Sequence, residues 1–205
     1  MVKYDTVADI GTDHGHLPIY LVQSGLAAKM LATDVNPGPL ASAMRNIVDC
    51  GPIMGEISTR LCDGLDGINP ADYAVCVISG MGGRLIIDIL RQNLDYAQSF
   101  KQLVLSPQRD TGDVRLFLHQ NGFRINDEEM IEEKGKFYNI LDASPGYEVS
   151  YDEKGYIFGE VLLRKKPEVL KKFVEAETEK IRKIGRDEYG RLLQLHEEVL
   201  EWLSK

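Results

Sequence analysis

Apolar and polar positions along most of this chain fall into alternating strand-like and helix-like runs. Short runs of β-branched and aliphatic residues indicate strands, and longer runs with apolar positions every three to four residues indicate helices. The strand-like runs are Thr6–Ile10, Met30–Asp34, Glu56–Leu61, Tyr73–Ser79, Gln102–Ser106, Phe123–Ile131 and Phe137–Ala143. The helix-like runs are His16–Leu26, Pro37–Cys50, Arg84–Leu94 and Asp113–Asn121.

This order of elements predicts an α/β fold. Strand–helix alternation with short connections is typical of a doubly wound, mostly parallel sheet. Tyr73–Ser79 is a nearly continuous apolar run, as expected of a central strand that is covered on both faces. The last two strand-like runs follow each other without a helix, so we expect them to close the sheet as an antiparallel hairpin.

The end of the chain has a different pattern. After a connection rich in Gly and Tyr (Ser144–Gly159), residues Pro167–Lys205 show helical periodicity with a break at Gly185. Two amphipathic helices joined there would form an antiparallel hairpin. The hairpin could be a cap packed on the sheet or a projecting arm that binds RNA. We therefore divide the chain into a ligand-binding domain, residues 1–159, and a helical tail, residues 160–205.

The composition narrows the class of protein. The 205 residues are 43% apolar and 27% charged, and no apolar stretch approaches the roughly 20 residues of a membrane span. The N-terminus lacks the apolar region of a signal peptide. Cys50, Cys62 and Cys76 have no CxxC spacing, so they indicate reduced thiols and no zinc site. We expect a cytoplasmic protein, monomeric, without membrane or metal partners.

The charge is unevenly distributed. The net charge of −8 argues against a general polyanion binder. From Arg164 to Lys205, however, the balance is +2, while the preceding residues carry −10. Such asymmetry hints at a tail that faces nucleic acid, although solvated helices also carry mixed charge.

Candidate binding residues follow the first predicted strand, because ligands bind at the carboxyl ends of strands in a doubly wound sheet. The strand ends in Asp9-Ile10-Gly11-Thr12-Asp13, and Gly11 lets the backbone approach a ligand closely. A dinucleotide site would need G-x-G-x-x-G for its pyrophosphate. The carboxylates would repel a pyrophosphate, whereas they suit a cationic sulfonium ligand with an ammonium group. The pattern therefore disfavours a nicotinamide dehydrogenase.

Three further strand ends carry candidate residues. Asp34 can accept both hydroxyls of a ribose, although an acidic residue there can also serve as a helix cap. Asp63-Gly64 offers a carboxylate to an adenine amino group, or forms a simple turn. Ser79–Gly83 contains three glycines, which suggest close approach to a flat ligand or a structural turn. Four such features at four strand ends favour one ligand site.

At these strand ends the chain closely resembles a known family. The runs Val7–Pro18 (VADIGTDHGHLP) and Ile78–Gly83 (ISGMGG) are similar to motifs of the bacterial tRNA (adenine-22-N1)-methyltransferases, the TrmK family. The resemblance continues through Asp34, Asp63-Gly64, Leu103–Leu105 and Gly135–Tyr138 into the tail. It implies a Rossmann-like class I methyltransferase with a C-terminal α-helical hairpin, S-adenosylmethionine as cofactor, and methylation of tRNA at N1 of adenosine 22.

The resemblance also implies roles for particular residues. It implies contacts with the methionine moiety around Asp9, Gly11 and Thr12, ribose recognition by Asp34, and adenine recognition around Asp63. The target-base pocket would lie at the glycine-rich loop and the loop after the fifth strand. The expected cofactor-binding set is Asp9, Gly11, Thr12, His14, Asp34, Val35, Asp63, Gly64, Leu65, Gly80, Met81 and Gly82.

The expected catalytic residues serve positioning more than proton transfer. Adenine N1 has a free lone pair, so methyl transfer needs mainly orientation, and a carboxylate can stabilise the cationic product. Asp13 is the candidate carboxylate, and Pro107 and Gln108 complete the expected set. Asp13 could instead cap the following helix, and His14 could orient Asp13 or be structural.

The chain departs from the family in two places. It has Ser106-Pro107-Gln108 where the family has Gln-Pro followed by an amide or small polar residue, and it starts almost at the first strand, where the family has a helical segment. Two alternatives therefore stay open: an RNA-binding protein of methyltransferase fold without catalysis, and a methyltransferase with another substrate. We expect tRNA phosphates to bind the densest basic run, which could also be a solvated helix face. Its residues are Arg164, Lys165, Lys166, Lys171 and Lys172.

Overall fold

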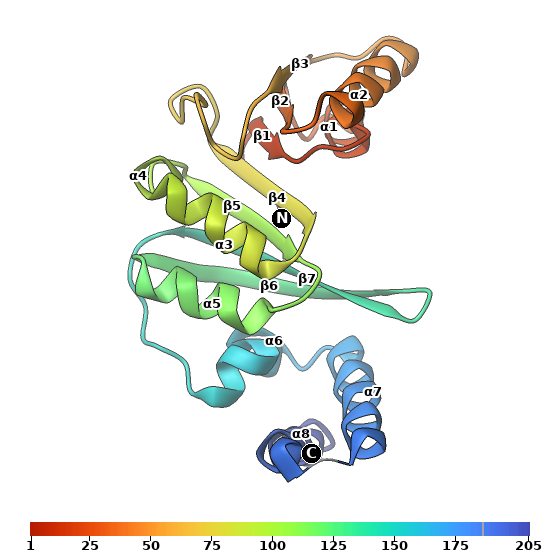
Figure 1. Ribbon diagram of the computed structural model, residues 1–205, viewed down its shortest axis with the longest axis vertical. Helices are drawn as coiled ribbons and strands as arrows, with labels where there is room; N and C mark the ends of the chain where they lie inside the picture. The colour runs from red at the N-terminus through yellow and green to blue at the C-terminus, as the bar shows by residue number, and fades with distance from the viewer. Residues whose placement is uncertain (186) are drawn as a thin grey trace.

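One twisted sheet organises the molecule. The structure is a computed structural model that describes residues 1–185 and 187–205. Within these residues, one sheet has the strand order β3-β2-β1-β4-β5-β7-β6 (Figure 1). Pairings from β3 across to β5 are parallel, and β7 runs antiparallel to both β5 and β6. The strands in chain order are Thr6–Ile10, Lys29–Asp34, Glu56–Leu61, Val75–Met81, Gln102–Pro107, Phe123–Glu133 and Lys136–Pro145.

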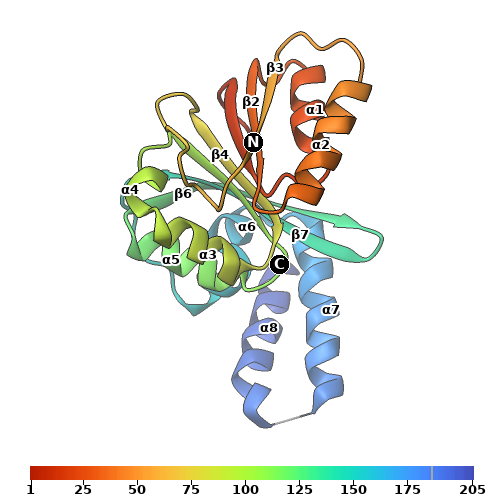
Figure 2. The ribbon, with the colours of Figure 1, turned by 45° about the horizontal axis from the view of Figure 1, so that its top comes forward.

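Helices cover both faces of the sheet. The helices α1 (His16–Gln23) and α2 (Pro37–Asp49) lie on one side, and α3 (Gly83–Gln92) and α5 (Thr111–Gln120) lie on the other, as Figure 2 shows. The short helix α4 (Leu94–Ala97) follows α3 directly. This is the three-layer arrangement that the alternation of elements predicts, so the predicted fold class is confirmed.

The pleat of the strands explains how one sheet supports two cores. Side chains alternate between the faces of a strand, so neighbours in sequence belong to different cores. In β1, Val7 packs with Leu21 and Val22 of α1. The next residue, Ala8, belongs to the core that contains Ile86 of α3. All five side chains are buried, which fixes the register of β1 and thereby the position of the loop that follows it.

The tail forms a helical hairpin with a small core of its own. After η1 (Gly155–Gly159) come α6 (Glu160–Lys165), α7 (Glu168–Ile184), η2 (Asp187–Tyr189) and α8 (Gly190–Leu203). The two long helices lie antiparallel, side by side, and project away from the sheet (Figure 2). Their buried apolar residues pack against α6, η1 and β6 at the base of the hairpin. The residues from α7 and α8 are Leu170, Val174, Leu195 and Val199, and they pack against Met130 of β6, Phe158 of η1 and Leu162 of α6.

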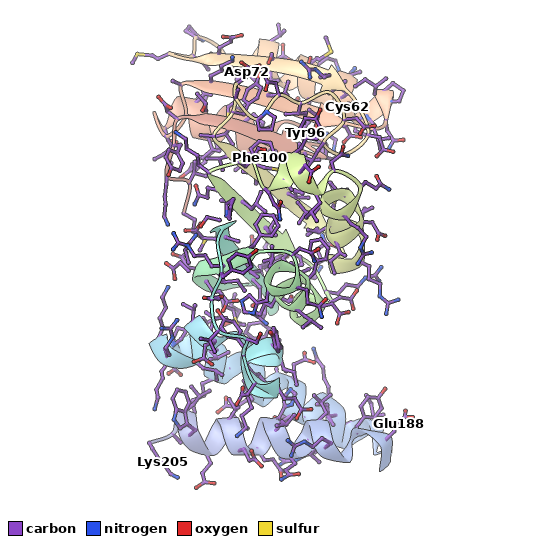
Figure 3. The ribbon with its side chains drawn as sticks, turned by 90° about the vertical axis from the view of Figure 1, so that its left-hand side faces the viewer. Cys62, Asp72, Tyr96, Phe100, Glu188 and Lys205 are labelled. Atoms are coloured by element: carbon purple, nitrogen blue, oxygen red, sulfur yellow. The ribbon has the colours of Figure 1, made fainter. Side chains whose placement is uncertain are left out.

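The tail thus combines features of both predicted arrangements. Its base is packed, as in a cap, while its far end projects, as in an arm. Figure 3 shows Glu188 and Lys205 at the opposite end of the molecule from Cys62, which lies at the end of β3. No helix in the described part of the chain is long and apolar enough to cross a membrane.

The observed elements differ from the predicted ones at identifiable points. The first helix ends at Gln23 instead of Leu26, because Ser24 caps it and Gly25 adopts a φ of +70°. Strand β4 continues to Met81 through a bulge at Gly80 instead of ending at Ser79. The helices α4, η1 and α6 were not predicted, because short helices show too few turns for a periodic signal.

Candidate active site

A cavity of about 660 Å³ opens at the carboxyl ends of the parallel strands. It lies where the chain order reverses, between the neighbouring strands β1 and β4, with β2 and β3 to one side. In a doubly wound sheet this switch point is the usual ligand site, because the loops there diverge to opposite faces. The predicted site residues that line this cavity are Asp9, Gly11, Thr12, Asp13, Asp34, Val35, Asp63, Gly64, Gly80, Met81 and Gln108.

Four predicted residues lie outside the lining of this cavity. His14 is exposed, and its backbone oxygen accepts a hydrogen bond from Asn46 at 2.9 Å. Leu65 belongs to the apolar core on the α3 side. Gly82 caps the N-terminus of α3, and Pro107 is buried at the end of β5. Several lining residues were not predicted: Ile10, His16, Leu17, Thr33, Asn36, Pro39, Cys62, Ser79, Leu85 and Ile89.

The loop after β1 is shaped by left-handed backbone conformations. Gly11 and Gly15 have φ values of +72°, and Asp13, a residue type that tolerates this region, has +53°. A Cβ on Gly11 would lie 2.0 Å from Cε of Met81, so any other residue would displace the end of that side chain as well as strain the backbone at this φ. The amide of Thr12 donates to the Thr33 oxygen at 2.7 Å, which ties the loop to β2.

Asp34 holds the same loop from the end of β2. Its Oδ2 accepts a hydrogen bond from the Asp13 amide at 3.3 Å, and its Oδ1 accepts one from the Asn36 amide at 2.8 Å. A carboxylate has about four acceptor positions, so these two bonds leave about two for a ligand. Asp34 therefore both fixes the loop and offers acceptors to the cavity.

Asp9 lines the cavity with a buried carboxyl group. The side chain is almost completely buried, and burial raises the pKa of its carboxyl group from 3.8 to about 6. The neighbouring Thr12 hydroxyl lowers the pKa by less than burial raises it, and its oxygen has no hydrogen-bond partner among the described residues. A cation placed beside Asp9 would favour its ionised form, so the cavity is suited to a positively charged group.

The raised pKa of Asp9 predicts a pH-dependent stability. Because the folded pKa lies above the unfolded value, the stabilising effect of the protonated carboxyl group is lost as the pH rises from about 4 through 6. The ionised group therefore destabilises the protein at neutral pH. We expect Asp9→Asn to stabilise the purified protein by about 1 kcal/mol more at pH 8 than at pH 5. Urea unfolding of both proteins at the two pH values measures this, and an equal effect at both would contradict the assignment.

On the side of the cavity opposite to Asp9 and Asp34, two backbone hydrogen bonds join the segment after β4 to the loop after β5. The Gln108 amide donates to the Met81 oxygen at 2.8 Å, and the Gly83 amide donates to the Arg109 oxygen at 2.9 Å. The bulge at Gly80 turns the end of β4 toward this contact. Gln108 is thereby held at the cavity edge with an exposed side-chain amide, which can both donate and accept.

Between the acidic side of the cavity and the side that carries Gln108, the lining is partly apolar. Val35 and Leu85 are each more than half exposed although they are aliphatic, and both line the cavity. The Oγ1 atom of Thr12 is buried with no hydrogen-bond partner among the described residues. An unsatisfied buried hydroxyl and exposed aliphatic side chains both indicate a surface that a ligand completes.

The fold itself is that of known methyltransferases. The structure of magnesium protoporphyrin IX methyltransferase from Synechocystis matches 71% of this chain and 72% of its own, with a TM-score of 0.57 at 18% identity, a likeness of fold alone. The doubly wound sheet with an antiparallel β7 and a cavity at its switch point is therefore the Rossmann-like fold of class I methyltransferases.

The family is shown by sequence as well as by fold. The tRNA (adenine(22)-N(1))-methyltransferase (TrmK) family matches residues 7–200, and the chain belongs to this family. The tRNA (adenine(22)-N(1))-methyltransferase of Bacillus subtilis (strain 168) is 34% identical over 175 residues, which cover 82% of this chain and 73% of the relative.

Solved structures agree with this membership. Streptococcus pneumoniae Sp1610, in complex with S-adenosyl-L-methionine, matches with a TM-score of 0.89 at 34% identity, over 98% of this chain and 94% of that chain. The crystal structure of the B. subtilis M1A22 tRNA methyltransferase TrmK matches with a TM-score of 0.79 at 29% identity, over 99% of this chain and 92% of that chain.

Proposed function

We propose that this protein transfers the methyl group of S-adenosylmethionine to N1 of adenosine 22 in tRNA. One observation carries the proposal: a single cavity has the acidic residues Asp9 and Asp34 on one side and the exposed amide of Gln108 on the other. The acidic side suits a cationic, ribose-bearing cofactor, and the amide side suits a base. Family membership identifies the base as adenosine 22 of tRNA. Since tRNA is the substrate, we place the protein in the cytoplasm.

The residues of the cavity fit the proposed cofactor. The Asp9 carboxylate suits the ammonium group of the methionine moiety, and the unsatisfied Thr12 hydroxyl offers that moiety a hydrogen bond. The remaining acceptor positions of Asp34 suit the two ribose hydroxyls. Val35 supplies an apolar surface for the adenine, and the exposed Asp63 carboxylate can accept its amino group.

In methyl transfer, the role of the protein is to position the target. When bound, S-adenosylmethionine supplies a methyl group that is already activated by its sulfonium. Gln108 can accept a hydrogen bond from the exocyclic amino group of the target adenine, which leaves the N1 lone pair free and orients it. The target base gains a positive charge when N1 is methylated. Asp13, at the cavity edge, can stabilise that charge through its carboxylate.

The predicted basic cluster divides into two kinds of side chain. Lys165 contacts the Asp127 carboxylate and the Glu128 oxygen, and Lys172 lies 3.5 Å from the Glu132 carboxylate. Lys166 lies 3.8 Å from the centre of the Trp202 ring. Arg164 and Lys171 have no hydrogen-bond or ion-pair partner among the described residues. We propose that the cluster holds tRNA phosphates, with the two unpaired side chains contributing most.

Paired and unpaired members of the cluster should therefore respond differently to substitution. For Arg164→Ala with Lys171→Ala, we expect the slope of log affinity for tRNA against log salt concentration to flatten by about 0.7–0.9 per lost contact. For the matched double variant Lys165→Ala with Lys172→Ala, we expect a smaller change of slope and a lower melting temperature. Filter binding at several salt concentrations measures the slopes. Wild-type slopes for the first variant would mean that the unpaired side chains face only water.

A single reaction tests the proposed activity. Labelled S-adenosylmethionine is incubated with the protein and unmodified tRNA, and the digested nucleosides are separated by mass spectrometry. We expect the label in 1-methyladenosine. Cofactor and tRNA binding without transfer would instead identify an RNA-binding protein without catalysis. Label in a different nucleoside would identify a methyltransferase with another target.

A further inference from the structure

A second cavity, of about 420 Å³, shares one lining residue with the first. Gln108 lines both cavities, so the two are neighbours at the edge of the proposed target-base pocket. One wall is the end of the β6–β7 hairpin at Gly135–Tyr138. The other wall is a stripe on α7 with helical spacing, formed by Phe173, Glu177 and Lys180. We call this cavity the hairpin groove.

The hairpin groove has a defined shape because its two walls are packed together. The rings of Phe137 and Phe173 meet edge to face with centroids 5.5 Å apart. Such aromatic contacts fix geometry as well as burying apolar area. The β-hairpin of the sheet domain is thereby attached to the first long helix of the tail, and the groove between them belongs to both domains.

The residues that line the groove carry a net positive charge in an acidic protein. Lys136 is exposed and has no ion-pair or hydrogen-bond partner among the described residues. Within the described residues, Lys180 pairs only with Glu177 of its own helix, at 2.6 Å, and this exposed pair is weak enough to exchange for a phosphate. The chain as a whole carries −8, so a polyanion that reaches the cofactor cavity must be attracted locally.

The groove also contains an aromatic side chain without a hydrogen-bond or ring partner among the described residues. Side chains alternate along β7, so Lys136 and Tyr138 share the face of the strand opposite to Phe137. All three residues line the groove, which therefore runs around the edge of the hairpin, with Phe137 toward α7 and with Lys136 and Tyr138 on the other face. Tyr138 is half-buried, and it makes no hydrogen bond or ring contact with any described residue. A free tyrosine beside a free lysine is a common combination for single-stranded RNA, because bases stack on the ring and phosphates bind the cation.

We propose that the hairpin groove binds the RNA strand next to the target adenosine. Lys136 and Lys180 bind phosphates, and Tyr138 stacks on a base adjacent to the one that enters the cofactor cavity. This assignment rests on the proposed function, since it places the neighbouring nucleotides next to Gln108. Held there, the strand can present the target base unstacked from its neighbours, which an enzyme acting on the Watson–Crick edge of a folded tRNA requires.

The charge component is tested by paired substitutions in the full-length protein. For Lys136→Ala with Lys180→Ala, we expect the salt dependence of log tRNA affinity to flatten by about 1.4, at about 0.7 for each phosphate contact on a single strand. The matched control is Lys134→Ala with Lys183→Ala. It removes one lysine from the same hairpin and one from the same helix, and Lys183 has a similar exposed partner in Glu179. Neither control lysine lines the groove.

The stacking component is tested at Tyr138. Stacking on an aromatic ring accounts for about a five- to hundredfold change in affinity per base, so Tyr138→Leu should weaken tRNA binding within that range. Tyr138→Phe keeps the ring and should restore binding. Affinity for S-adenosylmethionine, measured by calorimetry, should stay at the wild-type value in all groove variants, because the acidic side of the cofactor cavity is untouched.

The possible results are distinguishable. The groove assignment would be overturned if the groove and control variants had equal salt dependence of tRNA affinity, or if Tyr138→Leu and Tyr138→Phe lost equal affinity for tRNA. In either case the wild-type protein would still methylate tRNA. Failure of the proposed function would instead appear in the wild-type protein, as binding of S-adenosylmethionine without transfer to tRNA.

Discussion

Replacing Asp34 with alanine is expected to weaken the binding of S-adenosylmethionine about ten- to a hundredfold. Hydrogen bonds to a charged acceptor contribute about 1.5–3 kcal/mol, and the proposed ribose would lose its acceptor at the end of β2. The loop after β1 would also lose its bond from the Asp13 amide to Asp34 Oδ2. Both effects act on the cofactor side of the cavity. Isothermal titration calorimetry with S-adenosylmethionine measures the change.

Two comparisons separate the ribose contact from general charge effects. Asp34→Asn keeps one carbonyl acceptor and should weaken binding less than alanine does. Asp72→Ala removes the same charge from an exposed turn outside the cavity and should leave the affinity unchanged (Figure 3). Unchanged affinity in a folded Asp34→Ala protein would rule out the ribose assignment.

Replacing Gly83 with alanine is expected to slow methyl transfer about a hundredfold. A Cβ on Gly83 would lie 2.7 Å from the backbone oxygens of both Arg109 and Asp110, which cannot move without moving the loop. That loop carries Gln108, and a displacement of about 1 Å of a positioning group can cost about a hundredfold in rate. Overpacking should also reduce the stability by about 1–3 kcal/mol.

The Gly83 effect should fall on catalysis more than on cofactor binding. The substituted position lies on the Gln108 side of the cavity, so the affinity for S-adenosylmethionine should change much less than the single-turnover rate. Gly38→Ala is the matched control, because a Cβ on Gly38 in α2 would meet no atom within 4 Å. A single-turnover rate in Gly83→Ala equal to that of Gly38→Ala would show that Gln108 does not position the target.

The fold and the acidic side of the cavity were predictable from the sequence. Parallel strands bring their carboxyl ends to one edge of a sheet, so residues far apart in the chain, such as Asp9, Asp34 and Asp63, were expected to line one cavity, and they do. Gly11 was also informative, because it too follows the carboxyl end of a strand. Its φ of +72° is a backbone conformation that other residues rarely adopt.

Other features depend on side-chain directions that a strand or loop pattern does not specify. His14 was expected at the cofactor, yet it is His16 that lines the cavity, because the loop turns at Asp13 and Gly15 before α1 begins. Leu65 follows Asp63-Gly64 closely in sequence but points into the core. Both outcomes follow from a local turn, whose exact course one sequence does not determine.

The tail shows a similar limit for charge patterns. A run of basic residues predicts a positive surface, but the partners that neutralise it come from distant elements. Lys165 meets Asp127 of β6, and Lys172 meets Glu132 of the same strand. The unpaired Lys136, by contrast, lies in an acidic stretch of sequence, and only the packing of the hairpin against α7 reveals that it faces a cavity.

The position of the methyl group on the RNA tests the central claim most directly. Methylation of N1 blocks the Watson–Crick edge, so reverse transcription of the reacted tRNA stops at the modified adenosine. The measurement compares a tRNA transcript that has adenosine at position 22 with one that has guanosine there, each incubated with the wild-type protein and S-adenosylmethionine. We expect a new stop at position 22 in the first transcript and none in the second. Methyl transfer that proceeds equally on both transcripts, or a stop at another position, would contradict the account.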